Sequence, residues 1–215
     1  MSSLRPDLEF ISHWVQPRTH VLDLGCGDGT LMRHLQETRQ VTGYGLEIDP
    51  GNVVKSTEAG IQVIQMDIDQ GLDAFADQSF DYVILTQALQ VVRHPDRLLA
   101  EMLRIGRKGI VTFPNFGYWR SRMQIAWRGR MPVSETLPDA WYDTPNIHLC
   151  TVRDFEALCR QQGYRVLSRQ VVDAAHHGNR LMSHLPNLLG EIALYSLTAG
   201  HRRGSALNKT QFALE

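Results

Sequence analysis

The stretch VLDLGCGDGTL, residues 21–31, decides the fold of this chain. Apolar residues surround Asp23, and three glycines then alternate with other residues, at Gly25, Gly27 and Gly29. The apolar run predicts a buried strand, and the leucine spacing after the glycines predicts a helix. Glycine at such a junction tolerates a positive φ and lets backbone approach a ligand closely. The stretch therefore predicts a strand, a tight turn and a helix, with a ligand at the turn.

The rest of the chain repeats this alternation of strands and helices. Val, Ile and Leu dominate the predicted strands, and amphipathic segments separate them. This pattern indicates an α/β fold with a mostly parallel sheet that helices cover on both faces. Further strands are predicted over 41–48, 62–68, 80–87, 108–114, 164–172 and 191–198, with helices over 4–15, 94–105, 116–128 and 151–163.

Size and composition limit the possible organisation and location of the protein. The chain has 215 residues, 43% of them hydrophobic, and a formal net charge of -1. We expect one domain over 1–199, with a flexible C-terminal tail over 200–215. The near-neutral charge disfavours a dedicated nucleic-acid or membrane-surface binder. Three cysteines without CxxC spacing, no signal peptide and no apolar run of membrane-spanning length together predict a cytoplasmic protein.

The spacing of the glycines distinguishes two kinds of ligand. The dinucleotide fingerprint GxGxxG would require a third glycine where this chain has Thr30. With Asp23, the glycines instead resemble the acidic-x-G-x-G-x-G motif of class I S-adenosylmethionine-dependent methyltransferases. That resemblance implies a Rossmann-like, seven-stranded class I methyltransferase fold that binds S-adenosylmethionine or S-adenosylhomocysteine. A purely structural tight turn remains the alternative explanation.

Residues at three further strand ends extend the resemblance. Glu47 lies about 20 residues beyond the glycines, where an acid accepts hydrogen bonds from ribose hydroxyls in related folds. The resemblance places Asp67 at the adenine amino group and Thr86 near the methionine part of the cofactor. Solvated carboxylates are the alternative for both acids. The candidate cofactor-binding residues are Asp23, Gly25, Cys26, Gly27, Gly29, Glu47, Ile48, Asp67, Ile68, Thr86 and Gln87.

Segment 114–148, after the fifth strand, is rich in aromatic and basic side chains. It is a candidate substrate lid, an RNA-contacting patch or a protein-docking insertion, and some of its aromatics are expected to cap the sheet core. No acid occurs between Pro114 and Met131. The segment holds Trp119, Trp127, Trp141, Arg120, Arg122, Arg128 and Arg130, with Tyr118, Tyr142 and His148 as candidates to orient a substrate or accept a proton.

Histidines cluster once more, at His176, His177 and His184. Their spacing matches no standard metal-ligand pattern, so we predict solvated loop histidines and assign no metal.

Longer strings narrow the resemblance to one family. VLDLGCGDGTL, GYGLEID, FDYVILTQALQVV, VTFPNFGYWRSR and TPNIHLCTVRDFEALC together resemble the methionine biosynthesis protein MetW family, from about residue 4 to about residue 198. The resemblance implies a role in methionine biosynthesis as an activating or regulatory partner of homoserine O-acyltransferase (MetX). The alternative is an S-adenosylmethionine-dependent methyltransferase that acts on a small molecule or RNA. No catalytic residue is assigned.

Overall fold

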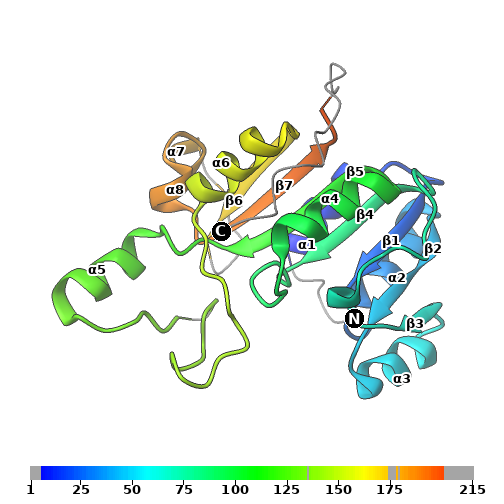
Figure 1. Cartoon of the computed structure of the whole chain (residues 1–215), viewed down its shortest axis with the longest axis horizontal. Coiled ribbons are helices and arrows are strands. Elements are labelled where there is room, and N and C mark those ends of the chain that lie inside the picture. The colour runs from blue at the N-terminus through cyan, green and yellow to red at the C-terminus, as the bar shows by residue number, and fades with distance from the viewer. Residues whose placement is uncertain (1–5, 135, 174–177, 179, 201–215) are drawn as a thin grey trace, which may run out of the picture.

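A seven-stranded sheet in the order β3-β2-β1-β4-β5-β7-β6 forms the centre of the molecule (Figure 1). The computed structural model describes residues 6–134, 136–173, 178 and 180–200. Each pairing from β3 to β5 is parallel, and β7 runs antiparallel to both β5 and β6. The predicted Rossmann-like, mostly parallel sheet is therefore confirmed. The strands are β1 His20–Leu24, β2 Thr42–Glu47, β3 Val63–Gln65, β4 Phe80–Thr86, β5 Gly106–Pro114, β6 Arg165–Val172 and β7 Ile192–Thr198.

Helices cover both faces of the sheet. α1 and α2 pack on one face through Ile11 and Met32, while α4 and α6 pack on the other through Met102 and Phe155. No helix in the described ranges is long and apolar enough to cross a membrane. The helices are α1 Pro6–Trp14, α2 Thr30–Arg39, α3 Pro50–Glu58, the 3₁₀ turn η1 Ile68–Gln70, α4 Pro95–Ile105, α5 Trp119–Arg128, α6 Val152–Gln162, α7 Arg180–His184 and α8 Pro186–Leu189.

Local capping explains where several elements begin. The Asp49 side chain accepts from the Asn52 N–H at 2.8 Å, so α3 starts where an N-cap followed by Pro50 predicts it. Thr151 and Asp154 form a reciprocal capping box at the start of α6.

Two predicted boundaries are wrong by three residues. The third strand ends at Gln65 and not at residue 68, because Asp67 accepts from the Asp69 N–H at 2.9 Å and starts the 3₁₀ turn. The helix after β5 begins at Trp119 and not at residue 116. Upstream of it, the Asn115 side-chain oxygen Oδ1 accepts from the Gly117 N–H at 3.0 Å and holds that backbone in a turn.

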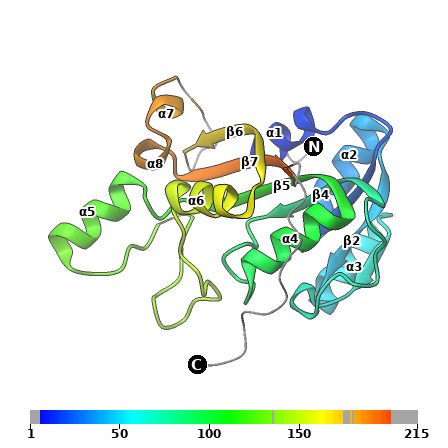
Figure 2. The ribbon, with the colours of Figure 1, turned by 45° about the horizontal axis from the view of Figure 1, so that its top comes forward.

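Asn115 closes the base of a long insertion between β5 and α6. Its side chain is buried, donates to the Gly190 carbonyl at 2.7 Å and accepts from the Val152 N–H at 3.1 Å. Between these points the chain makes α5 and then runs through 129–134 and 136–150 without a helix or strand. Figures 1 and 2 show α5 standing away from the sheet and from the helices that cover it.

Some predictions fall outside the described residues. They include the tail from residue 201 onward and two of the three clustered histidines, His176 and His177. The third, His184, ends α7.

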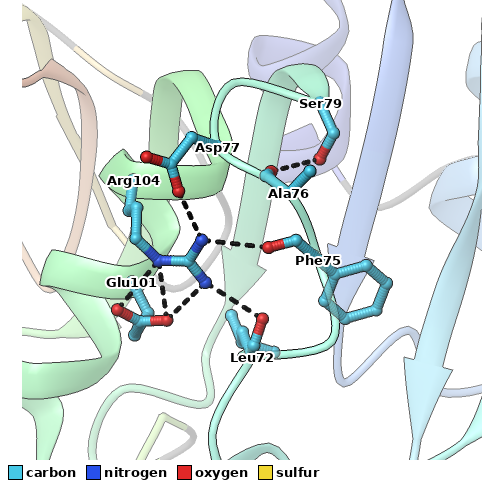
Figure 3. A network of polar contacts seen from close by, with 7 residues as sticks. All are labelled: Leu72, Phe75, Ala76, Asp77, Ser79, Glu101 and Arg104. Carbon is cyan, nitrogen blue, oxygen red and sulfur yellow. Dashed lines mark hydrogen bonds and ion pairs between the residues drawn. The ribbon is translucent and has the colours of Figure 1, made fainter.

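One arginine, Arg104 of α4, fixes the loop between η1 and β4. The Arg104 guanidinium donates to the Leu72 and Phe75 carbonyls at 3.1 and 2.9 Å (Figure 3). It also pairs with Glu101 at 2.7 Å and Asp77 at 2.6 Å, and these hydrogen bonds raise the pKa of Arg104. Arg104 therefore supplies a donor to the Phe75 carbonyl, and gives the Leu72 carbonyl a second donor beside the Phe75 N–H at 3.0 Å.

We expect Arg104→Met to lower the free energy of unfolding by about 1–3 kcal/mol, because the Phe75 carbonyl loses the Arg104 donor and the Leu72 carbonyl keeps only the Phe75 N–H. Urea denaturation measures the change. Arg107→Met is the matched control, since Arg107 is exposed and only approaches Asp81 at 3.8 Å. Equal stability of the two variants would contradict this role for Arg104.

Candidate functional site

The glycine loop follows β1 and turns back across the end of β2. Gly25, Gly27 and Gly29 all have positive φ, at 69°, 58° and 76°. A side chain at any of these positions would strain the backbone, so the turn requires the glycines that the sequence supplies. The N–H groups of Gly25 and Cys26 both donate to the Leu46 carbonyl, at 2.8 and 3.0 Å. These bonds seat the loop on the carboxyl end of β2.

A fourth glycine allows this close approach. A Cβ added to Gly45 in β2 would lie 2.3 Å from Cys26 Sγ and 2.6 Å from Cys26 Cβ. The Cys26 side chain therefore occupies the space that any larger residue at 45 would fill. Burial raises the pKa of the Cys26 thiol to about 12, so this thiol acts in packing and not as a nucleophile.

Glu47 ties the glycine loop to the next strand. One carboxylate oxygen, Oε2, accepts from the Gly27 N–H at 2.8 Å. The other, Oε1, accepts from the Ile48 and Asp49 N–H groups, each at 2.9 Å. A carboxylate has about four acceptor positions, so these three donors leave room for one ligand hydroxyl. The arrangement suits an acid that holds a ribose while it also shapes the loop.

Asp23 is the most unusual ionisable group of the site. It is fully buried, and its Oδ1 meets no donor among the described residues. Burial, followed by the nearby Glu47 charge, raises the pKa of Asp23 to about 7. A buried carboxylate oxygen without a donor is costly unless a ligand supplies one. The site therefore favours a ligand that carries a cationic donor.

Two cavities flank the loop, and Gly25 lies in the wall of both. The first has a volume of about 490 Å³ and the second about 300 Å³. Predicted residues lining the first are Asp23, Gly25, Cys26, Gly27, Thr86 and Gln87, and those lining the second are Gly25, Glu47, Ile48, Asp67 and Ile68.

Gly29 is the one predicted residue that lines neither cavity. A Cβ at this position would meet Ser56 Oγ and Ile61 at 3.0 Å, so Gly29 serves the close packing of α2 against α3 and the residues after it. Ser56 in turn donates to the Gly27 carbonyl at 2.8 Å and supports the loop from behind.

Part of each cavity wall consists of residues that the sequence motifs do not predict. Leu8, Arg33, His34 and Glu37 line the first cavity, and Met66, Asp69, Ala88, Val91 and Val92 line the second. A helical signal was available for the α2 residues, because Thr30, Arg33, His34 and Glu37 recur every three or four positions and share one face.

The loop after β4 connects both cavities to the insertion. Thr86 and Gln87 line the first cavity, and Ala88, Val91 and Val92 line the second. The Gln90 carbonyl in the same loop accepts from the Ile147 and His148 N–H groups at 2.9 and 3.0 Å. His148 Nε2 also lies 3.1 Å from the Arg93 carbonyl. One short loop thus contacts the ligand site and holds the end of the insertion.

The candidate catalytic side chains of the insertion lie apart from this site. Tyr118 is buried against Trp119, and Tyr142 is exposed. Neither they nor His148 line either cavity. Among the described residues, no group of three or more His, Cys, Asp or Glu side chains could hold a metal ion.

The strand order, the antiparallel β7 and the glycine loop with an acid after β2 define the class I S-adenosylmethionine-dependent methyltransferase fold. Solved structures agree. A methyltransferase of this class from Archaeoglobus fulgidus superposes with a TM-score of 0.65 at 15% identity, over 90% of this chain and 91% of that chain. One from Listeria monocytogenes gives 0.66 at 13% identity, over 90% and 98%.

Sequence comparison identifies the family. The family model described as methionine biosynthesis protein MetW matches residues 5–197. The bifunctional methionine biosynthesis protein MetXA/MetW of Rhodopirellula baltica is 34% identical over 210 residues, which cover 93% of this chain and 34% of that protein. The chain belongs to the MetW family.

A second relative matches over a shorter region. The ribosomal protein L11 methyltransferase of Burkholderia vietnamiensis is 32% identical over 97 residues, or 45% of this chain and 31% of that protein. The chain spans about a third of the length of the curated relatives it matches.

The raised pKa of Asp23 predicts a pH-dependent stability of the ligand-free protein. Between the ordinary value of 3.8 and about 7, the folded protein holds this proton and the unfolded chain does not. The contribution of Asp23 to the free energy of unfolding therefore falls as pH rises through this window, by on the order of 4 kcal/mol. We expect Asp23→Asn to become more stable than the parent protein as pH rises from 4 to 8.

Urea denaturation of both proteins at several pH values tests this expectation. A stability difference that stays constant from pH 4 to pH 8 would contradict it.

The approach of Cys26 to β2 predicts a second effect. We expect Gly45→Ala to displace the loop and weaken S-adenosylmethionine binding at least about tenfold. A loss of about 1.4 kcal/mol of binding free energy already lowers the affinity by this factor. Isothermal titration calorimetry gives the affinity. Gly109→Ala is the control, because its Cβ would meet only the ends of the Leu103 and Met102 side chains, at 3.2 and 3.9 Å, and residue 109 lines neither cavity. Equal affinities would show that the loop does not need the space above Gly45.

Proposed function

We propose that this protein binds S-adenosylmethionine or S-adenosylhomocysteine at the glycine loop and acts as a regulatory subunit of homoserine O-acyltransferase, MetX, in methionine biosynthesis. The observation that carries the proposal is the Rhodopirellula baltica relative, whose name joins MetXA and MetW in one protein. This chain matches about a third of that protein, which leaves the greater part for the acyltransferase. Covalent fusion indicates that the two parts work side by side.

The two cavities support the choice of cofactor. The second cavity offers Glu47 for the ribose and Asp67 with Ile68 for the adenine, and the first offers the buried Asp23 oxygen for the cationic methionine end. Gly25 lines both cavities, and because it has no side chain it would let an elongated ligand extend from one to the other. When bound, S-adenosylmethionine would supply an activated methyl group on a sulfonium. S-Adenosylhomocysteine shares the adenosine and ammonium groups, so the same residues would hold it.

The loop after β4 supports a regulatory role. Its residues line both cavities, and its Gln90 carbonyl holds Ile147 and His148 of the insertion. A ligand that orders this loop would also favour one position of the insertion. The coupling requires that the cofactor bind the two positions with different affinity. The protein would then report the level of S-adenosylmethionine, which lies downstream of homoserine acylation.

The cysteines bear on the location of the protein. Cys26, Cys150 and Cys159 are free thiols, which agrees with a reducing compartment. A cytoplasmic location is therefore part of the proposal.

The decisive measurement is the homoserine acylation rate of the purified cognate acyltransferase, alone and with this protein at saturation. We expect a rate increase of at least about tenfold, which corresponds to 1.4 kcal/mol of activation free energy. S-Adenosylmethionine is then titrated into the same assay. An unchanged rate, together with no complex in analytical ultracentrifugation, would overturn the partner role.

Asp23→Asn separates cofactor sensing from activation. This variant keeps the fold but replaces the carboxylate that receives the cationic end of the ligand. We expect it to stimulate acylation as the parent protein does and to lose the response to S-adenosylmethionine. A response of normal size and midpoint would show that Asp23 does not hold the cofactor.

Methyl transfer is a second candidate function, which one observation favours. Arg33, His34 and Glu37 line the first cavity beyond the residues assigned to the cofactor, and could orient an acceptor. Such enzymes need a positioned nucleophile more than a strong base. Incubation with methyl-labelled S-adenosylmethionine and extracts of small molecules or RNA tests this function. Labelling that His34→Ala abolishes would support it, and no labelling of any fraction would count against it.

A further inference from the structure

The insertion between β5 and α6 carries most of the exposed apolar surface of the protein. We call residues 119–149 the α5 arm. Of the seventeen large apolar side chains exposed in the described residues, nine lie in this arm, which is a short part of the chain. Trp127, Trp141 and Tyr142 are 81%, 74% and 77% exposed. The other six are Trp119, Ile125, Met131, Val133, Ile147 and Leu149.

The helix of the arm has little packing of its own. α5 has ten residues, and Ser121 is its one buried residue. Helices of this length are marginal in water, and tertiary packing of an apolar face normally stabilises them. α5 stands apart from the sheet in both views (Figures 1 and 2), so its own domain does not provide this packing. The exposed Trp127 and Ile125 are therefore suited to contact another molecule.

The charge of the arm selects the kind of partner. From residue 114 to 134 the sequence has no Asp or Glu, whereas Arg120, Arg128 and Arg130 are exposed. A symmetric contact between two copies would place this basic surface against itself, which like charges disfavour. The exposed Trp141 and Tyr142 lie between two exposed acids, Asp139 and Asp143, which would repel the phosphates of RNA. An acidic protein surface with an apolar centre is complementary to the basic stretch 114–134, which does not include these two acids.

We propose that the α5 arm is the docking surface for homoserine O-acyltransferase, and that it binds an apolar patch ringed by carboxylates on that enzyme. This inference rests on the proposed function and assigns its contact surface. Trp127 is the main apolar anchor, because it is the most exposed of the nine side chains. Arg128 and Arg130 supply charge complementarity at the rim, which governs association rate and specificity.

The test measures binding to the purified cognate acyltransferase by surface plasmon resonance. We expect Trp127→Ser to raise the dissociation constant about thirtyfold or more, as for truncated interface hot spots. Arg128→Glu should slow association and make binding less sensitive to salt. Matched controls are Val54→Ser, an exposed apolar residue of α3, and Arg97→Glu, an exposed arginine of α4. Both controls should bind normally.

Measurements of S-adenosylmethionine affinity and of thermal unfolding keep the outcomes distinct. All variants should bind S-adenosylmethionine and unfold thermally like the parent protein, since Trp127 and Arg128 lie outside both cavities. If the parent protein binds the acyltransferase and the two arm variants bind equally well, the docking surface is elsewhere, although the proposed function stands. If the parent protein neither binds nor activates the acyltransferase, the proposed function fails and the docking inference fails with it.

Other occupants of the arm would also overturn the inference. In that case Trp127→Ser would abolish self-association in analytical ultracentrifugation, or RNA binding in a mobility-shift assay, and leave the affinity for the acyltransferase unchanged.

Discussion

The Glu47 carboxylate joins the two strands that build the ligand site. It accepts one N–H from the glycine loop after β1 and two from the backbone after β2. These three N–H groups lie at the end of the parallel sheet, where the strand-to-strand hydrogen bonds stop. Among the described residues, they have no other acceptor than Glu47. Because one carboxylate satisfies all three, the loop and the end of β2 share a single geometry. The positions of both cavities, and of Gly25 between them, depend on that geometry.

The same region contains a conflict between stability and binding. Asp23 is buried next to Glu47, and its Oδ1 lacks a donor among the described residues. In a purely structural protein, an amide or an apolar residue would be more stable at this position. A positively charged ligand that donates to Asp23 would offset the cost of burying this carboxylate. Local instability of this kind is common where a protein must recognise a small molecule.

Much of the fold follows from local sequence signals. The strand cores, the Asp49 and Thr151 caps and the glycine turn each depend on residues within a few positions, so periodicity and capping patterns predict them. Ten of the eleven predicted site residues line the two cavities for the same reason, since they occupy strand ends. The exception, Gly29, packs against Ser56 and Ile61, a contact between residues far apart in the chain.

Features that depend on tertiary contacts could not be predicted. The early end of the third strand has a local cause that strand periodicity does not reveal, because Asp67 accepts from the Asp69 N–H in competition with the sheet. The loop carbonyls held by Arg104 and the Gln90 contact with the insertion join segments that no sequence motif relates. The sequence also leaves open whether the aromatics after β5 cap the core, and only their exposure in the structure resolves this for most of them.

Because Asn115 fixes both ends of the insertion, the insertion can change in evolution independently of the rest of the fold. One buried side chain binds the start of the insertion at Gly117, its end at Val152 and the Gly190 carbonyl before β7. The insertion therefore leaves the end of β5 and enters α6 at nearly the same point. Changes in its length or composition need not disturb strand register or the cofactor cavities. The chain is in this respect modular: a common α/β body can carry interchangeable arms, each matched to a different partner.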